Sequence, residues 1–232
     1  MSDQRALADA RARILDRIAE ACARVARDPA EVTLVAVSKT VPPERLVAAV
    51  DAGLTTLGEN RVQEAEAKVP AVPGATWHLI GPLQSNKARR ALATFDVIES
   101  VDSLELARRL DRLAAESGSA PRPILLQVNV DADEAKAGFA PAELERDLPD
   151  VLALERLEVR GLMTVGRLVA SPEDARPTFV ALRELRDRLR ADRPRLGPEL
   201  SMGMSDDYPI AVEEGATIVR VGRALFGARP PA

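Results

Sequence analysis

The sequence predicts an α/β protein that forms a single (β/α)8 TIM-type barrel over residues 1–232, with an extra helix at its N-terminus. Eight short apolar runs rich in β-forming residues recur along the chain, and helical segments separate them. Strands that are apolar on both faces and joined by helices belong to a parallel sheet covered by helices. Eight such strands favour a closed barrel, and no Gly-x-Gly-x-x-Gly motif indicates a dinucleotide fold.

The first element in the chain is an amphipathic helix, predicted over residues 3–27. Leu7, Ile14, Ile18, Cys22 and Val25 recur in it at helical spacing, so we expect Cys22 in the core. The eight strands are predicted at residues 32–38, 54–58, 76–80, 96–101, 123–130, 157–165, 199–202 and 217–222. The helices between them are predicted at residues 43–52, 60–68, 85–94, 103–116, 141–155, 172–192 and 207–214.

Start signals support several of these helices. Ser103 is an N-cap candidate, and residues 171–174 combine a serine cap, a first-turn proline and early acids. After the last strand, residues 225–232 are too few and too rich in proline for a full helix. We therefore expect the N-terminal helix to occupy the place of the missing eighth outer helix.

Composition and charge limit the partners that we expect. The formal net charge of −4 argues against a nucleic acid as the main partner. No apolar run is long enough to span a bilayer and the N-terminus has no apolar signal region, so we expect a cytoplasmic protein without a membrane partner. One cysteine and one histidine allow no intrachain disulfide and leave no set of zinc ligands.

Lysine is rare in this chain, and one lysine stands at the end of a predicted strand. The basic residues are mostly arginine, and the lysines are Lys39, Lys68, Lys87 and Lys136. An arginine guanidinium cannot form a stable imine with an aldehyde, whereas a lysine amine with a lowered pKa can. Lys39 therefore indicates carbonyl chemistry, with pyridoxal 5′-phosphate (PLP) as the leading cofactor. The alternative is a lysine that only reaches from the sheet rim into solvent.

Polar and small residues also follow other predicted strands. The carboxyl ends of the strands form the active site of a (β/α)8 barrel, so we expect these residues to meet near Lys39. Gly203, Ser205 and Gly222 lie after the last two strands, where backbone N–H groups and a hydroxyl suit a phosphate. Arg220 lies inside an apolar strand and needs a partner, either on a neighbouring strand or in a ligand ring.

Six segments of the chain resemble, in order, the pyridoxal phosphate homeostasis proteins (the YggS/PROSC group). They are residues 36–40, 58–64, 78–87, 160–163, 200–207 and 219–222. The resemblance implies a PLP barrel of fold type III, related to the N-terminal domain of alanine racemase. It also implies roles for individual residues.

In this resemblance Lys39 matches the family's Schiff-base lysine, and Arg220 matches the arginine that faces the pyridine nitrogen. The phosphate end of PLP is matched by Ser201, Ser205, Gly222 and Arg223, and the pocket lining by Asn60, His78 and Met202. Arg223 departs from the small hydroxyl residue often found at its position. Lys136 matches a second family lysine near the pocket mouth, which is implied to help hold or pass on the cofactor.

The implied site favours binding over catalysis. An arginine at the ring nitrogen disfavours ring protonation and weakens PLP as an electron sink. A two-base racemase also needs an acid or base opposite the lysine. Tyr208, the only tyrosine, is a poor candidate, because it follows strand seven on the phosphate side. We expect a monomer that stores, buffers or delivers PLP to apo PLP-dependent enzymes, with little or no turnover. The alternatives are a PLP-dependent enzyme such as a slow amino-acid racemase and a PLP-free sugar-phosphate enzyme.

Overall fold

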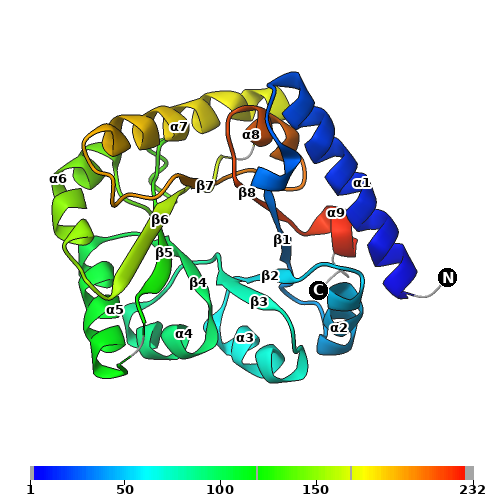
Figure 1. The fold of residues 1–232 in the computed structure, drawn as a ribbon, viewed down its shortest axis with the longest axis horizontal. Coiled ribbons are helices and arrows are strands. Elements are labelled where there is room, and N and C mark those ends of the chain that lie inside the picture. The colour runs from blue at the N-terminus through cyan, green and yellow to red at the C-terminus, as the bar shows by residue number, and fades with distance from the viewer. Residues whose placement is uncertain (1–2, 119, 168, 228–232) are drawn as a thin grey trace.

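The computed structural model describes residues 3–118, 120–167 and 169–227 and shows a closed barrel of parallel strands (Figure 1). Each strand pairs with the next along the chain, and the last strand closes onto the first. The strands are β1 (Thr33–Val37), β2 (Thr56–Glu59), β3 (Thr76–Leu79), β4 (Val97–Val101), β5 (Arg122–Gln127), β6 (Leu157–Met163), β7 (Glu199–Ser201) and β8 (Ile218–Val221). The predicted fold class and the eight predicted strands are confirmed.

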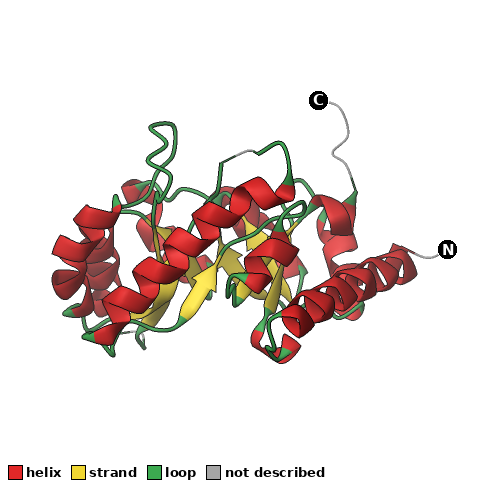
Figure 2. Ribbon diagram, turned by 90° about the horizontal axis from the view of Figure 1, so that it is seen from above, coloured by secondary structure: helices red, strands yellow, loops and turns green. Residues whose placement is uncertain are grey.

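Helices cover the outside of the strands, as Figure 2 shows. They are α1 (Asp3–Arg24), α2 (Pro43–Asp51), α3 (Val62–Lys68), α4 (Ala88–Thr94), α5 (Leu104–Glu116), α6 (Pro141–Leu152), α7 (Arg176–Ala191), α8 (Tyr208–Glu213) and α9 (Arg223–Phe226). The predicted cap of α5 is confirmed, because the Ser103 hydroxyl accepts a hydrogen bond from the Leu106 N–H at 3.2 Å. Among the helices described, none combines the length and the apolar character needed to cross a membrane.

Helix α1 takes the place of the eighth outer helix, as predicted. The helix after β8, α9, has only four residues, and α1 packs against α8, α2 and α9 (Figure 1). Leu7, Ile14, Ile18 and Cys22 of its predicted apolar stripe are buried, whereas Val25 follows the end of the helix and is exposed. An ion pair of 2.6 Å between Arg24 and Glu213 joins α1 to α8. The N-terminal helix thus completes the wall of the barrel.

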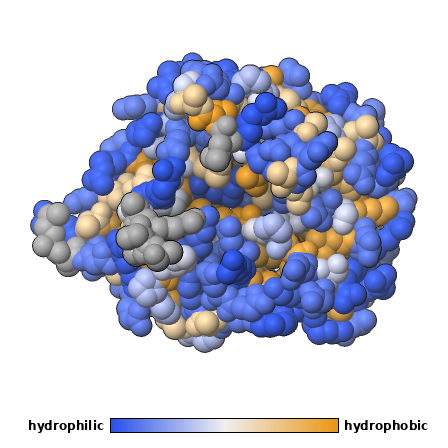
Figure 3. Space-filling model, turned by 180° about the vertical axis from the view of Figure 1, so that it is seen from behind, coloured by the Kyte–Doolittle hydropathy of each residue, from blue (hydrophilic) through white to orange (hydrophobic). Residues whose placement is uncertain are grey.

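One face of each strand packs against the outer helices and the other faces the barrel interior, because successive side chains of a strand point to opposite faces. The outward side chains form a large aliphatic layer with the helices. The inward side chains form a small apolar cluster of Val35, Val97, Leu125, Met163 and Ile218. Seen from behind, the molecule is hollowed at its centre, with apolar residues inside a hydrophilic rim (Figure 3). The interior of the barrel is therefore where a polar side chain must find a partner.

Candidate functional site

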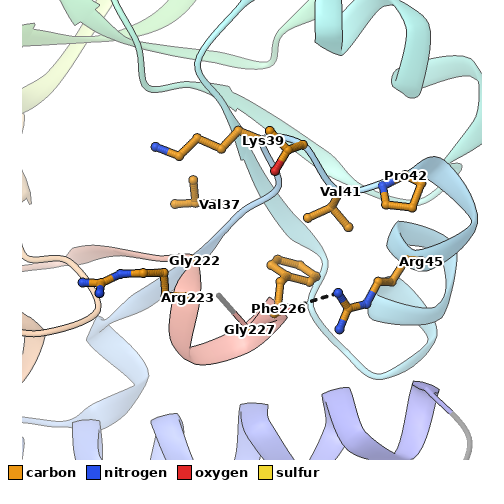
Figure 4. Close-up of a pocket in the computed structure, with 10 residues that line it drawn as sticks. Val37, Lys39, Val41, Pro42, Arg45, Gly222, Arg223, Phe226 and Gly227 are labelled. Atoms are coloured by element: carbon orange, nitrogen blue, oxygen red, sulfur yellow. Dashed lines mark hydrogen bonds between the residues drawn. The ribbon is translucent and has the colours of Figure 1, made fainter. Parts of the chain in front are cut away.

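Lys39 lies just past the end of β1, on the rim of the barrel. It is half-buried and lines an open pocket of about 180 Å³ together with Gly222, Arg223 and residues of the loop that leads into α2. In Figure 4 the side chains of Lys39 and Arg223 extend in the same direction past Val37, while Phe226 and Arg45 lie on the other side. The pocket thus joins the ends of β1 and β8.

Gly222 allows these two strand ends to come close together. The ladder between β1 and β8 runs up to the pair Ala36 and Val221, so Gly222 follows directly beside Val37. A Cβ atom at Gly222 would lie 3.3 Å from the Cβ of Val37, closer than most side chains approach one another. The Gly222 N–H also donates a hydrogen bond of 3.3 Å to the Ser205 hydroxyl, which joins the loops after β7 and β8.

The loop after β7 is shaped by Gly203, which has φ +90°. A Cβ atom there would come within 2.5 Å of the Ala211 Cβ, so the loop can lie on α8 only with glycine at this position. Further along the loop, Asp206 pairs with Arg223, and both side chains are exposed. The Arg223 guanidinium is thus held at the surface, while its backbone N–H lies in the first turn of α9, where helices leave N–H groups without intrahelical partners.

Arg220 points into the barrel and is bound to the protein. Its guanidinium donates to the Ser201 hydroxyl at 2.6 Å and to the Thr164 carbonyl at 2.7 Å. Within the part of the chain that the structure describes, these bonds use two of the five N–H donors of an arginine. Burial lowers the pKa of Arg220, and the charges of Glu99 and Asp207 oppose that effect. The side chain is therefore a cation held rigidly between β6, β7 and β8, with donors still available.

A fully buried carboxylate, Glu99, continues this arrangement across the barrel. It accepts hydrogen bonds from Ser201 at 2.5 Å and lies 2.6 Å from Nδ1 of His78. Burial by itself would raise the pKa of Glu99, but His78, Arg220 and Ser201 outweigh burial and hold it below its ordinary value. We call His78, Glu99, Ser201 and Arg220 the axial cluster. Within it Glu99 and Arg220 supply opposite charges, and buried charges need such a partner.

A second buried cluster lies directly under Lys39. Lys68, the last residue of α3, donates to the Ser38 carbonyl at 2.9 Å and to Oε1 of Glu59 at 2.6 Å. The Ser38 hydroxyl donates to the same Glu59 oxygen at 2.7 Å. Burial raises the pKa of Glu59, and the hydrogen bonds from Lys68 and Ser38 offset only part of this shift. We call Ser38, Glu59 and Lys68 the rim cluster.

The structure brings together some of the residues expected at the site and places others elsewhere. Asn60 is half-buried in the loop after β2. His78 faces the barrel axis and lines a different cavity, of about 290 Å³, with residues from the amino-terminal ends of the strands. Met202 lies in the aliphatic layer between strands and helices, because Ser201 takes the inward position. His78 and Met202 are therefore not among the residues that line the pocket of Lys39. Of the other expected residues, Gly222 and Arg223 line this pocket, whereas Asn60, Ser201, Ser205 and Arg220 do not.

Lys136 lies in the loop that follows β5. Its amine is 3.4 Å from a carboxylate oxygen of Asp133 in the same loop. The loop folds back on the strand, since the amides of Gln127 and Asn129 donate to the backbone carbonyls of Ala137 and Asp133 at 2.8 Å. These two polar residues therefore shape the loop, and Lys136 is separate from the residues that line the Lys39 pocket.

Comparisons with known proteins agree with this architecture. Residues 13–230 match the alanine racemase N-terminal domain family. The pyridoxal phosphate homeostasis protein of Aquifex aeolicus is 42% identical over 219 residues, which cover 94% of this chain and 96% of that protein. The chain belongs to the family of pyridoxal phosphate homeostasis proteins.

Solved structures contain barrels that are similar to this one. PipY of Synechococcus elongatus PCC7942, solved with PLP bound, is 46% identical, with a TM-score of 0.81 over 90% of this chain and all of that chain. Alanine racemase of Clostridium difficile 630 is only 13% identical, with a TM-score of 0.70 over 94% of this chain and 60% of the racemase, and shares the fold. The family therefore uses the alanine racemase barrel.

The sequence did not predict the roles of two residues, Lys68 and Glu99. Lys68 is one of the few lysines of an arginine-rich chain, and it follows Glu64 by one helical turn, so a signal existed. Glu99 is a charged residue in a strand with three apolar residues and one serine, and a charge in such a strand indicates a buried partner. Lys68 contacts Ser38, and Glu99 contacts His78 and Ser201, which are all distant from it along the chain. A single sequence does not show which distant residues meet.

Proposed function

We propose that this protein binds PLP through Lys39 and acts in intracellular PLP homeostasis, by storing the cofactor, buffering it or delivering it to apo-enzymes. The observation that carries the proposal is the junction of β1 and β8, where Lys39 and Gly222 line one pocket. On the same strand β8, Arg220 is fixed by two hydrogen bonds to described residues, which use two of its five donors. Relatives named pyridoxal phosphate homeostasis protein and the PLP-bound structure of PipY support this assignment.

Groups in the pocket and on the adjoining loop and strand fit the three functional parts of PLP. An aldehyde needs an amine, and Lys39 supplies it from the rim. A phosphate needs hydroxyl and backbone donors, and Ser205, Gly222 and the first turn of α9 supply them. A pyridine nitrogen needs a donor or a cation, and Arg220 is both. Ser201, matched to the phosphate end by the resemblance, would act through Arg220.

PLP supplies an aldehyde that forms a Schiff base with an amine and a ring that can withdraw electrons. Arg220 would hold its protons at the ring nitrogen without giving one up, so the ring would stay neutral and withdraw electrons weakly. Tyr208 is buried against α1, where Arg17 lies 5.2 Å from its ring centre. Burial raises the pKa of Tyr208 further. Tyr208 thus packs toward the outer helix and is not among the residues that line the Lys39 pocket, which favours holding over turnover.

We also propose an oligomeric state, a location and recipients of PLP for this protein. Lys39, Arg220 and Gly222 all come from one chain, so we propose that the cytoplasmic monomer is the functional unit. Apo PLP-dependent enzymes are the proposed recipients. We assign Lys136 to transfer on the resemblance to the family alone; its amine lies 3.4 Å from a carboxylate oxygen of Asp133.

A titration of the purified protein with PLP tests this function. We expect a visible absorption band that saturates at one PLP per chain, and transfer of PLP to an apo-enzyme that regains activity. Incubation with single amino acids is expected to leave their chirality unchanged. Amino-acid-dependent turnover that disappears in Lys39→Ala would replace the proposal by a slow racemase. A protein that never binds PLP would favour the sugar-phosphate alternative.

A further inference from the structure

Lys68, a buried lysine at the end of α3, acts on the backbone beside Lys39. Its side chain is 9% exposed, and its amine lies between the Ser38 carbonyl and the Glu59 carboxylate. Glu59 is fully buried. Burying a lysine ammonium against a backbone carbonyl costs free energy, because the charge loses its hydration and the side chain loses its conformational freedom.

The rim cluster occupies every polar group of Ser38. The Ser38 N–H donates to the Gly58 carbonyl at 2.9 Å, and its hydroxyl donates to Glu59. Its carbonyl accepts from Lys68 and from the Val41 N–H at 3.0 Å. The backbone leading into Lys39 is therefore held from three sides.

The residue after Lys39 is also constrained. Thr40 has φ +66°, a left-handed conformation that costs a β-branched residue free energy and persists only where the surroundings enforce it. The bond from the Val41 N–H to the Ser38 carbonyl closes this turn. Lys68 donates to the same carbonyl and so stabilises the turn that carries Lys39.

A lysine suits this position better than the arginine that the chain uses at 28 of its 32 basic positions, since 32 minus four lysines leaves 28. Its compact ammonium has three donors on one atom, and it reaches a carbonyl and a carboxylate at once. Glu64 lies 3.9 Å away as a further acid. A longer planar guanidinium would have to displace α3 or the Ser38 carbonyl.

We propose that Lys68, together with Glu59, is a positioning residue for the amine of Lys39. It sets the direction in which Lys39 leaves the rim, and so the rate at which Lys39 captures an aldehyde, without touching the cofactor. This inference rests on the proposed function. The two lysines then have different roles. Lys39 forms the bond to the aldehyde, and Lys68 orients the Lys39 side chain.

The test compares two ligands that differ at one group. Pyridoxamine 5′-phosphate has the ring and phosphate of PLP but no aldehyde, so its affinity reports the pocket without the Lys39 bond. We expect Lys68→Met to slow PLP capture on the order of 100-fold, the effect of misplacing a reacting group by about 1 Å. Its affinity for pyridoxamine 5′-phosphate should stay at the wild-type level. Lys87→Met, a half-buried lysine away from the rim cluster, is the control and should change neither.

Lys68→Met leaves Glu59 as a buried charge without its cation and could fail to fold. The double variant Lys68→Met with Glu59→Gln removes both charges and decides the question in that case. A folded variant that captures PLP at the wild-type rate would overturn the inference. Equal losses for both ligands would also overturn it, because they would show a purely structural role. A wild-type protein that captures no PLP would instead refute the proposed function, and this inference with it.

Discussion

The rim cluster and the axial cluster each stabilise a buried glutamate, but they do so through different contacts. Each surrounds one fully buried glutamate, Glu59 or Glu99, with a cation and a serine hydroxyl. In the rim cluster the cation binds the carboxylate directly and also holds a backbone carbonyl. In the axial cluster the serine lies between the cation and the carboxylate, and the Arg220 and Glu99 charges are 4.0 Å apart.

This difference shows in the two carboxyl groups. The pKa of Glu59 is raised because burial outweighs its partners, whereas the pKa of Glu99 is lowered because its partners outweigh burial. His78 accounts for much of the contrast, since Glu99 has it as an additional partner on the far side. The comparison suggests that the rim cluster is built to fix a backbone and the axial cluster to hold a charge.

The largest expected effect is that of Arg220→Ala on the axial cluster. Removing one partner of a buried charge pair typically costs about 3–5 kcal/mol of the free energy of unfolding. Here the change also leaves the Thr164 carbonyl and Ser201 without their donor. We expect a loss of this size in urea unfolding of the PLP-free protein, together with weaker PLP binding.

Arg188→Ala is the matched control, because Arg188 pairs with Glu145 at the surface, where ion pairs contribute little. It should leave the unfolding midpoint close to that of the wild type. An Arg220→Ala protein as stable as this control would show that the axial cluster does not depend on its cation. Equal PLP affinity in Arg220→Ala and wild type would exclude the ring-nitrogen role.

An intermediate effect is expected on the pH dependence of stability, with opposite signs for the two glutamates. The lowered pKa of Glu99 contributes stability above its ordinary pKa of 4.5, and this is lost as the pH falls through the lower folded value. The raised pKa of Glu59 contributes stability below 4.5, and this is lost as the pH rises through the higher folded value. Glu99→Gln should flatten the acid side of the curve, and Glu59→Gln the side above 4.5.

Chemical unfolding at a series of pH values, with the wild type as reference, measures both slopes. Slopes that change in the same direction in the two variants would contradict the contrast between the clusters. The result would then point to a shared effect of burial on both carboxyl groups.

The smallest effect on stability is expected at Lys39. Its half-buried side chain extends along the pocket and contributes little to the packed core. Lys39→Ala should therefore keep the thermal unfolding temperature of the PLP-free protein, while it removes the stabilisation that PLP gives to the wild type. A large loss of stability without PLP would show that Lys39 is part of the rim cluster rather than held by it.

The strands and helices were predictable because hydrophobic periodicity and turn residues are local signals. The orientation of single residues at strand ends was not. The alternation of β3 points His78 to the axis, where it meets Glu99. The alternation of β7 gives the inward place to Ser201, and Met202 packs in the outer aliphatic layer. A shift of one residue reverses the face, and the end of a strand is where periodicity is weakest.

The site was predictable to the extent that it follows the strand ends. Lys39 and Gly222 share a pocket, because parallel strands β1 and β8 are neighbours once the barrel closes. Lys68 was not predictable as part of the site, since it lies on the outer helix α3 and reaches in between two strand ends. Such contacts depend on the crossing of helix and sheet, which the sequence pattern does not specify.

One measurement tests the central claim, that Lys39 is the residue that binds PLP. The protein is saturated with PLP, reduced with borohydride, digested and analysed by mass spectrometry, with Lys39→Ala treated in parallel. We predict a pyridoxyl group on the peptide that contains Lys39, and loss of the visible absorption band on reduction. A wild-type protein that carries the label only on Lys68, Lys87 or Lys136, or carries none, would contradict the account.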